Sequence, residues 1–402
     1  MKAIILAGGY GTRLWPLTLR IPKAMVPVGG VPVVQHSIKA LKNAGITDII
    51  FSLNTNQKSV EDYFENGSKF GVNITYVYED TQNDSDKFGA IGAIEFALEK
   101  TGGPQDCIVI NGDNVFYGLD LLKMIEHHQV SKSQATLALY ALTNKSDVTQ
   151  YGVMQLDDEK KLITFQEKPK ENEAKSNLAS AGIYILGKVF LAEHLSQYIK
   201  NQKSSEKKPD RVGDLWAHYV GKLPIYGHPF EGMWGDTNTA QTYIHAHKQA
   251  MNFVVNPKDS KNIQNGLVQN SHKTIISENA KISELANIKG PCIIEDGCII
   301  EEGAIIGPNT HLMKNVVVGT NSSVTGSIIF EQTVIGSKCS ITDCIVDKES
   351  IISENSQIDP YSIIGTNCKL EKEVRITNNS RIWPKIRLGS KTIIAGEVIL
   401  EN

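Results

Sequence analysis

Residues 3–18 read AIILAGGYGTRLWPLT, and Ile21-Pro22-Lys23 follows shortly after. The apolar start of this stretch predicts a buried strand that runs into a glycine-rich loop. Glycines at 8, 9 and 11 allow backbone conformations that a side chain would block, so successive N–H groups can surround an anion. Arg13 and Lys23 add two positive charges, which predicts a polyphosphate site. The spacing matches neither the Walker loop nor the dinucleotide-binding fingerprint. A plain turn is the simpler alternative, but a turn needs neither cation.

The segments that follow alternate between strand and helix patterns. Helix patterns fall at 31–44, 57–66 and 89–99, and strand patterns at 48–53, 73–78 and 107–111. This order predicts an α/β fold with an open, doubly wound, Rossmann-like sheet, whose ligands lie at the carboxyl ends of the strands. Gly112-Asp113 follows the strand at 107–111, so we expect it at the same edge as the glycine loop. An Asp there can bind Mg²⁺, whereas a helix cap or a turn is the alternative interpretation.

The string Gly-Gly-x-Gly-Thr-Arg-Leu-x-Pro-Leu-Thr, with Pro-Lys after it, closely resembles the signature of sugar-1-phosphate nucleotidyltransferases. The resemblance implies transfer of a nucleotidyl group from an NTP to a sugar 1-phosphate, with release of pyrophosphate. It also implies two Mg²⁺ ligands, Asp113 and Asp236. The string Trp234-Gly235-Asp236-Thr237 is the looser match, because the family's later Gly is absent at Thr239. The implied nucleotide contacts are Leu6, Gly8, Gly9, Gly11, Thr12, Arg13, Lys23, Gly89 and Gly112.

Beyond residue 134 the pattern changes to strands at 135–142, 153–156, 162–166 and 179–186. Three short strings there resemble the family's sugar-phosphate pocket in the same order, and they imply contacts at Gly152, Glu167, Lys168, Ser180 and Tyr184. The implied catalytic residues are Arg13, Lys23, Asp113, Lys168 and Asp236. The sugar phosphate is already an anion, so the reaction needs charge neutralisation and alignment rather than a Ser, Cys or His nucleophile.

The last third of the chain carries a six-residue repeat. Aliphatic residues recur every sixth position from Ile276 to Val324, the register slips by one before Ile329 and again before Val346, and the sixes then continue to Leu400. A smaller residue stands two positions before many of them. This period predicts a parallel β-helix, and it resembles the left-handed hexapeptide-repeat family with three hexapeptides per coil. We therefore predict a nucleotidyltransferase domain at 1–252, a polar linker at 253–274 and a left-handed β-helix at 275–402.

Composition sets further limits on function. The 402 residues carry a net charge of −3, which gives no electrostatic reason to expect nucleic acid or an anionic membrane as a partner. The chain begins at its first strand and has no apolar run of 18 residues, so we expect a cytoplasmic protein. No Cys-x-x-Cys pair occurs among the six cysteines, and five of them occupy the small position of the repeat. We expect these to be buried thiols rather than zinc ligands.

Substrate specificity stays open at this point. The double glycine and Arg381-Ile382-Trp383-Pro384-Lys385 look most like mannose-1-phosphate guanylyltransferases, whereas the stretch 113–118 looks like glucose-1-phosphate thymidylyltransferases, and a uridylyltransferase is a further alternative. A second, acetyl-CoA-dependent acyltransferase activity would need a base in the repeat region, where His311 is the one histidine, at an outward position. A non-catalytic regulatory subunit is the remaining alternative, and the joint presence of Arg13, Lys23, Asp113 and Asp236 argues against it.

We also expect a homo-oligomer that assembles through the β-helix. Apolar residues at outward or terminal positions, among them Trp383, Ile386 and Val398, and the unpaired backbone edge of the last coil favour such contacts. Hexapeptide-repeat relatives commonly self-associate, which supports the expectation by resemblance only.

Overall fold

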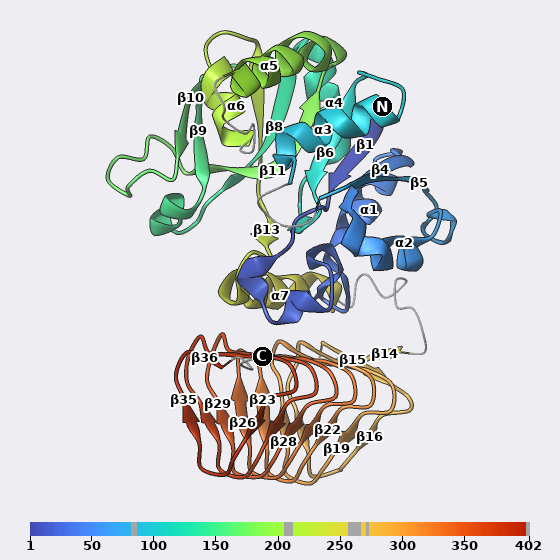
Figure 1. Ribbon diagram of the computed structural model, residues 1–402, viewed down its shortest axis with the longest axis vertical. Helices are drawn as coiled ribbons and strands as arrows, with labels where there is room; N and C mark the ends of the chain where they lie inside the picture. The colour runs from blue at the N-terminus through green and yellow to red at the C-terminus, as the bar shows by residue number, and fades with distance from the viewer. Residues whose placement is uncertain (82–86, 205–211, 256–266, 271–272, 399–402) are drawn as a thin grey trace. The chain divides into compact units, whose positions relative to one another are not determined.

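The computed structural model describes residues 1–81, 87–204, 212–255, 267–270 and 273–398 (Figure 1). The chain forms two compact units, one of Met1–Tyr10 and Val33–Trp234 and the other of Gly11–Pro32 and Gly235–Asn402. Most of the predicted linker at 253–274, and the last repeat position, Leu400, lie outside the described residues.

A mixed nine-stranded sheet forms the centre of the first unit. Seven of its strands follow the order β10-β9-β11-β6-β1-β4-β5, and β8 pairs with β11 and β12. Strands β4, β1 and β6 pair in parallel, and β11 joins β6 in the antiparallel direction. The bounds are β1 (Lys2–Leu6), β4 (Asp48–Asn54), β5 (Asn73–Glu79), β6 (Cys107–Asn111), β8 (Ala135–Ala141), β9 (Gly152–Leu156), β10 (Leu162–Glu167), β11 (Leu178–Leu186) and β12 (Ile225–Phe230). The doubly wound prediction is confirmed.

Helices cover both faces of this sheet. On one face Ile4 and Val109 share a buried core with residues of α3 (Gly89–Lys100), α5 (Ser196–Ser204), α6 (Val212–Tyr219) and the π-helical segment η7 (Phe190–Leu195). On the other face Phe51 stacks on Phe64 of α2 (Lys58–Phe64), and His128 of α4 (Leu121–Val130) hydrogen-bonds Thr136 of β8 at 2.9 Å. The unit also contains α1 (Val33–Asn43), η4 (Thr55–Gln57), η5 (Ser68–Phe70), β7 (Asn114–Tyr117) and η6 (Lys145–Gln150), and β13 (Met233–Asp236) begins in it.

The second unit is built around a left-handed β-helix with three parallel sheets (Figure 1). Strand β14 alone is antiparallel to its neighbour, β15. The first sheet contains β14 (Leu267–Asn270), β15 (Thr274–Ser277), β18 (Cys292–Ile294), β21 (Thr310–Leu312), β24 (Ile328–Ile329), β27 (Ile345–Val346), β30 (Ile363–Ile364), β33 (Arg381–Ile382) and β36 (Glu397–Val398). The second contains β16 (Lys281–Ile282), β19 (Ile299–Ile300), β22 (Val317–Val318), β25 (Val334–Ile335), β28 (Ile351–Ile352), β31 (Lys369–Leu370) and β34 (Arg387–Leu388). The third contains β17 (Asn287–Ile288), β20 (Ile305–Ile306), β23 (Ser323–Thr325), β26 (Ser340–Thr342), β29 (Gln357–Ile358), β32 (Arg375–Ile376) and β35 (Ile393–Ile394).

The repeat positions form the core of the coils as predicted. Ile294, Ile300 and Ile306 are each at most 1% exposed, and the five repeat-region cysteines are buried beside them. Corner residues such as Asn309, Asn315 and Asn321 have φ near +57° to +59°, a left-handed conformation that Asn tolerates better than most residues. At the two register slips, Leu312 pairs with Ile329 and Ile329 with Val346, so these coils are 17 residues long rather than 18.

Helix α7 (Ala240–Val254) and the segment 11–32 belong to the same unit as the β-helix. Met251 and Val255 share a buried cluster with Ile275 and Ile293 of the first sheet. The segment 11–32 consists of three short 3₁₀ turns, η1 (Thr12–Leu14), η2 (Leu17–Leu19) and η3 (Lys23–Met25), and a hairpin of β2 (Pro27–Val28) and β3 (Val31–Pro32). The Tyr243 hydroxyl on α7 donates to the Pro27 carbonyl at 2.8 Å, which ties the helix to this hairpin.

Three outward or terminal positions of the β-helix differ from the expectation of exposed apolar surface. Ile386 is 5% exposed within the core, and Trp383 and Val398 pack against that core. His311, also expected to face solvent, is 0% exposed because its ring stacks on His247 of α7, with ring centroids 6.1 Å apart. An outward position is therefore not a solvated one where a helix covers the sheet.

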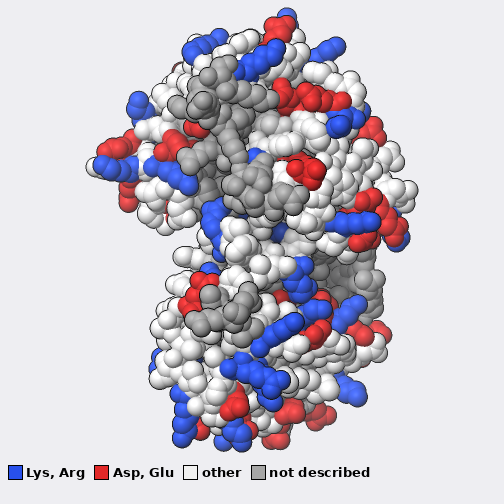
Figure 2. All heavy atoms as spheres, viewed as in Figure 1, with Lys and Arg blue, Asp and Glu red and all other residues white. Residues whose placement is uncertain are grey.

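Acidic and basic side chains are intermixed on the face shown in Figure 2. On the β-helix, opposite charges stand above one another on successive coils, as Lys372 does with Glu354 at 2.8 Å. Among the described helices, none combines the length and apolarity that a bilayer crossing requires.

Candidate active site

In the first unit, the ends of β1 and β6 lie directly against each other. The Gly112 amide donates to the Leu6 carbonyl at 2.8 Å, and a side chain at 112 would come within 2.9 Å of the Ala7 Cβ. Only glycine fits there. Asp113 follows as a half-buried residue between β6 and β7. The alternative interpretation of Asp113 as the cap of the next helix is wrong, because the Asp120 carboxylate caps α4 by accepting from the Lys123 amide.

Glu79, at the end of β5, is a buried carboxylate that the sequence interpretation missed. It is 5% exposed, and it accepts hydrogen bonds from the Ser52 hydroxyl at 3.0 Å and the Phe88 amide at 3.3 Å. Burial raises its pKa above the ordinary range, although both hydrogen bonds act in the opposite direction. An added Cβ on Gly8 would lie 3.4 Å from its Oε1 atom, and Gly89 begins α3 directly after Phe88. The carboxylate therefore lies beside two of the glycines implied as nucleotide contacts.

The loop that contains Gly8 and Gly9 is held by polar side chains. The Gln57 amide donates to the Gly9 carbonyl at 3.0 Å, and the Tyr10 hydroxyl lies 3.0 Å from the Thr81 carbonyl. An added Cβ on Gly9 would meet no atom within 4 Å, so the space above this residue is open. The first half of the signature loop is thus fixed in position and open on one side.

The implied sugar-phosphate residues occupy two strand regions of the same unit. Gly152 and Glu167 are paired on β9 and β10, and an added Cβ on Gly152 would come 3.1 Å from the Glu167 Oε2 atom. The Lys168 amide donates to the Tyr151 carbonyl at 3.1 Å. On β11 the hydroxyls of Ser180 and Tyr184 lie 3.3 Å apart, across a register shift in the pairing with β8, and burial raises the pKa of Tyr184.

In the second unit, the two cations of the signature loop converge on one amide. Arg13 donates to the Asn238 Oδ1 atom at 2.8 Å, and Lys23 donates to the same atom at 2.6 Å. The Asn238 amide in turn donates to Asp236 Oδ1 at 2.9 Å, so Arg13, Lys23 and the 5% exposed Asp236 form one cluster. Gly11 (φ 66°) and Thr12 lead into this cluster, and the Gly11 carbonyl accepts from the Thr18 hydroxyl at 2.7 Å.

Asn238 was also missed from sequence, although it lies two residues after the predicted metal ligand. Thr239, where the family pattern has a later Gly, caps α7 by accepting from the Thr242 amide at 3.2 Å. The departure from the pattern therefore has a structural role at a helix start. His245 and His247 point to different faces of α7, as expected from their spacing: His245 is exposed and His247 is buried.

Comparison with known proteins identifies the family. Residues 2–252 match the family model described as nucleotidyl transferase, and residues 288–399 match one described as the GMPPB C-terminal domain. The chain belongs to the nucleotidyl transferase family. With its relatives, described below, this makes the chain a sugar-1-phosphate nucleotidyltransferase.

Two curated relatives and one solved structure illustrate the range of this family. The bifunctional protein GlmU of Methanococcus maripaludis is 36% identical over 83% of this chain and 74% of its own length. A putative mannose-1-phosphate guanyltransferase of Sulfolobus acidocaldarius is 29% identical over 82% of this chain and 76% of its own length. The crystal structure of a putative glucose-1-phosphate thymidylyltransferase from Bacillus anthracis, in complex with a sucrose, superposes with a TM-score of 0.54 at 30% identity, covering 62% of this chain and 95% of that one.

Proposed function

We propose that this protein is a mannose-1-phosphate guanylyltransferase, which makes GDP-mannose and pyrophosphate from GTP and mannose 1-phosphate. The observation that carries the choice of base is the buried Glu79 carboxylate beside Gly8. The relatives named as guanyltransferases and the match of residues 288–399 to the GMPPB C-terminal domain point in the same direction.

The chemistry of the base favours a carboxylate at this position. The Watson–Crick edge of guanine presents two adjacent donors, N1–H and the N2 amino group, whereas uracil and thymine present one N–H between two carbonyl acceptors. An ionised carboxylate is an acceptor only, with about four lone-pair positions. Ser52 and Phe88 occupy two of the positions on Glu79, so acceptor capacity for two base donors is left.

The remaining residues would neutralise and align the phosphates. Arg13 and Lys23, which converge on Asn238, would hold the β- and γ-phosphates that leave as pyrophosphate. Lys168 would hold the sugar phosphate and direct its oxygen at the α-phosphorus in line with the leaving group. Glu167 would accept hydrogen bonds from sugar hydroxyls. Because the attacking oxygen is already anionic, no side chain needs to remove a proton from it.

Asp113 and Asp236 fit a Mg²⁺ site by their chemistry. Both offer carboxylate oxygens, and Mg²⁺ sites on nucleotides commonly use one or two carboxylates plus substrate phosphates. The Asp236 Oδ1 atom already accepts from Asn238, which orients the carboxylate and leaves its second oxygen for a metal. When bound, the ion would neutralise charge on the transferred phosphoryl group.

A matrix of NTPs against sugar 1-phosphates, with pyrophosphate release as the readout, tests this proposal. We expect the largest kcat/KM for GTP with mannose 1-phosphate. A preference for dTTP or UTP with glucose 1-phosphate would contradict the guanylyl assignment and favour the thymidylyl or uridylyl alternative. Release with no pair of substrates, from a folded protein, would favour the regulatory alternative.

The structure gives little support to an acyltransferase activity in the β-helix. The His311 side chain is fully buried against His247, and its Nε2 atom lies 2.7 Å from the Glu295 carboxylate. A general base must reach its substrate. We therefore propose a structural role for this histidine.

We also propose that the β-helix supports self-association. Ile299, Val334 and Ile351 are each more than a third exposed, and they stand in register with Val317 on the outward face of the second sheet. Sedimentation of the purified protein at micromolar concentration as a monomer would contradict this role.

A further inference from the structure

The segment Trp15–Arg20 of the signature loop contacts the β-helix at both of its ends. At the first end the Trp15 and Trp383 rings meet edge to face, with centroids 5.8 Å apart. At the second end the Arg20 guanidinium is paired with Asp347, which follows β27. Both contacts lie within the second compact unit. The middle of the loop is therefore held by residues more than 300 positions away in the chain.

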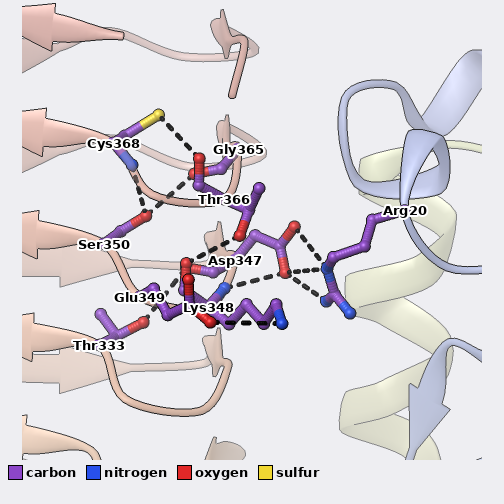
Figure 3. Close-up of polar contacts among 9 residues, drawn as sticks. All are labelled: Arg20, Thr333, Asp347, Lys348, Glu349, Ser350, Gly365, Thr366 and Cys368. Carbon is purple, nitrogen blue, oxygen red and sulfur yellow. Dashed lines mark hydrogen bonds and ion pairs between the residues drawn. The ribbon is translucent and has the colours of Figure 1, made fainter. Parts of the chain in front are cut away.

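The Arg20–Asp347 pair has the geometry of a specific clamp (Figure 3). The Nε of Arg20 lies 3.2 Å from both carboxylate oxygens, and a terminal nitrogen donates to Oδ1 as well. The Arg20 guanidinium also lies over the Phe330 ring, 5.4 Å from its centroid. The Asp347 side chain is 1% exposed and also accepts from the Lys348 amide at 2.9 Å. A planar guanidinium with several donors suits such a site better than an ammonium does.

The two phosphate-binding cations lie just outside this clamped segment. Arg13 precedes Trp15 by two residues, and Lys23 follows Arg20 by three. Both side chains reach the same oxygen of Asn238, so their meeting depends on the path of the chain between them. Arg20 is a third positive charge in the same short loop, and its pairing with Asp347 directs that charge toward the β-helix.

We infer that Asp347 is a positioning residue for the nucleotide: by holding Arg20, it keeps Arg13 and Lys23 converged on the place of the NTP phosphates. The inference rests on the proposed function and adds to it a role for the β-helix in substrate binding. Asp347 itself touches no substrate in this account. Its effect passes through the loop, so binding of GTP should depend on it and binding of the sugar phosphate should not.

The test compares Asp347→Asn with Asp343→Asn, the same chemical change four residues earlier. Asp343 pairs with Lys248 of α7 at 2.6 Å and does not hold the loop. We expect Asp347→Asn to raise the KM for GTP about tenfold and to leave the KM for mannose 1-phosphate unchanged. Amide hydrogen exchange in residues 11–25 should quicken in Asp347→Asn and stay as in the wild type in Asp343→Asn.

A second variant covers the case in which Asp347→Asn fails to fold. Arg20 is 30% exposed, so Arg20→Lys should fold, and it should raise the KM for GTP because an ammonium cannot make the paired contacts. The double variant should be no worse than Asp347→Asn alone, since the two residues act as one unit. Additive losses would show that Asp347 does not act through Arg20.

Three results would overturn the inference. One is an unchanged KM for GTP in Asp347→Asn together with a lowered melting temperature, which would make the pair merely structural. Another is an equal rise in both KM values, and the last is the same change in Asp343→Asn. If the wild type itself turned over no NTP, the proposed function would fail instead, and hydrogen exchange alone would still decide whether Asp347 holds the segment.

Discussion

His247 should make the stability of the second unit depend on pH. Its ring is 0% exposed on α7, and its Nδ1 atom accepts from the Gly29 amide at 3.3 Å. Burial, and then the charge of the neighbouring His311, lower the pKa of His247 from 6.5 to about 3. The folded protein therefore keeps this ring neutral over a pH range in which the unfolded chain protonates it. Stability is lost as the pH falls below 6.5, and the loss ends near pH 3.

The size of this effect follows from the two pKa values. Each pKa unit corresponds to about 1.4 kcal/mol. Linkage then predicts that His247 lowers the free energy of unfolding by about 2 kcal/mol between pH 7 and pH 5. With a urea dependence of about 1–3 kcal/mol per molar, the midpoint moves by roughly 1 M.

Urea unfolding of the wild type and of His247→Gln at pH 7 and pH 5 measures this contribution. Glutamine offers an oxygen to the Gly29 amide but does not titrate, so the variant should lose about 2 kcal/mol less on acidification. Lys248, Glu295 and His311 are present in both proteins, so their own titration largely cancels in the difference. His245→Gln, on the exposed face of the same helix, is the matched control and should behave as the wild type. An equal loss in wild type and His247→Gln would refute the reasoning.

Other expected results concern the site and the domain. Asp113→Asn should abolish pyrophosphate release at an unchanged urea midpoint, because it keeps the volume and removes the metal-binding charge; near-normal activity would remove Asp113 from the site. Glu79→Gln should lower kcat/KM for GTP about 100-fold, and the GTP reaction of the wild type should weaken as the pH falls through the raised pKa of Glu79; an unaltered base preference would show that another group reads the base. The six cysteines should react slowly with a thiol reagent in the native protein, since all are buried and burial raises the pKa of each, and rapid labelling of the native state would count against this. Removal of residues 253–402 should abolish GTP binding, because it deletes Asp347 and Trp383; a folded fragment with normal affinity would contradict a role of the β-helix in binding.

The parts of the molecule that follow a local pattern were predictable from sequence. The six-residue period defines the core positions of the coils, and even its two slips reappear as shortened coils. Strand and helix patterns gave the sheet and its helices because each element has an apolar face of its own period. The loop glycines and Gly112 were singled out because only glycine fits such turns and close contacts.

The contacts made across long sequence distances could not be predicted in this way. Glu79 looks like an ordinary polar residue at a strand end, and only the folded structure buries it beside Gly8. Arg20 and Asp347 are 327 residues apart, and no local pattern connects them. His311 illustrates the limit from the other side: the repeat correctly places it outward, but α7 covers that face.

The two shortened coils restrict how this chain can change its length in evolution. A stack of coils contacts only its neighbours, so whole coils can be gained or lost at an end without disturbing the others. At the short corners, however, Gly326 and Asp343 face Lys248, and a side chain at 326 would come 2.8 Å from the Lys248 Cε atom. An inserted residue there would push α7 away and shift Asp347 against Arg20. We therefore expect homologous chains to vary in coil number beyond Trp383 and to keep both shortened coils.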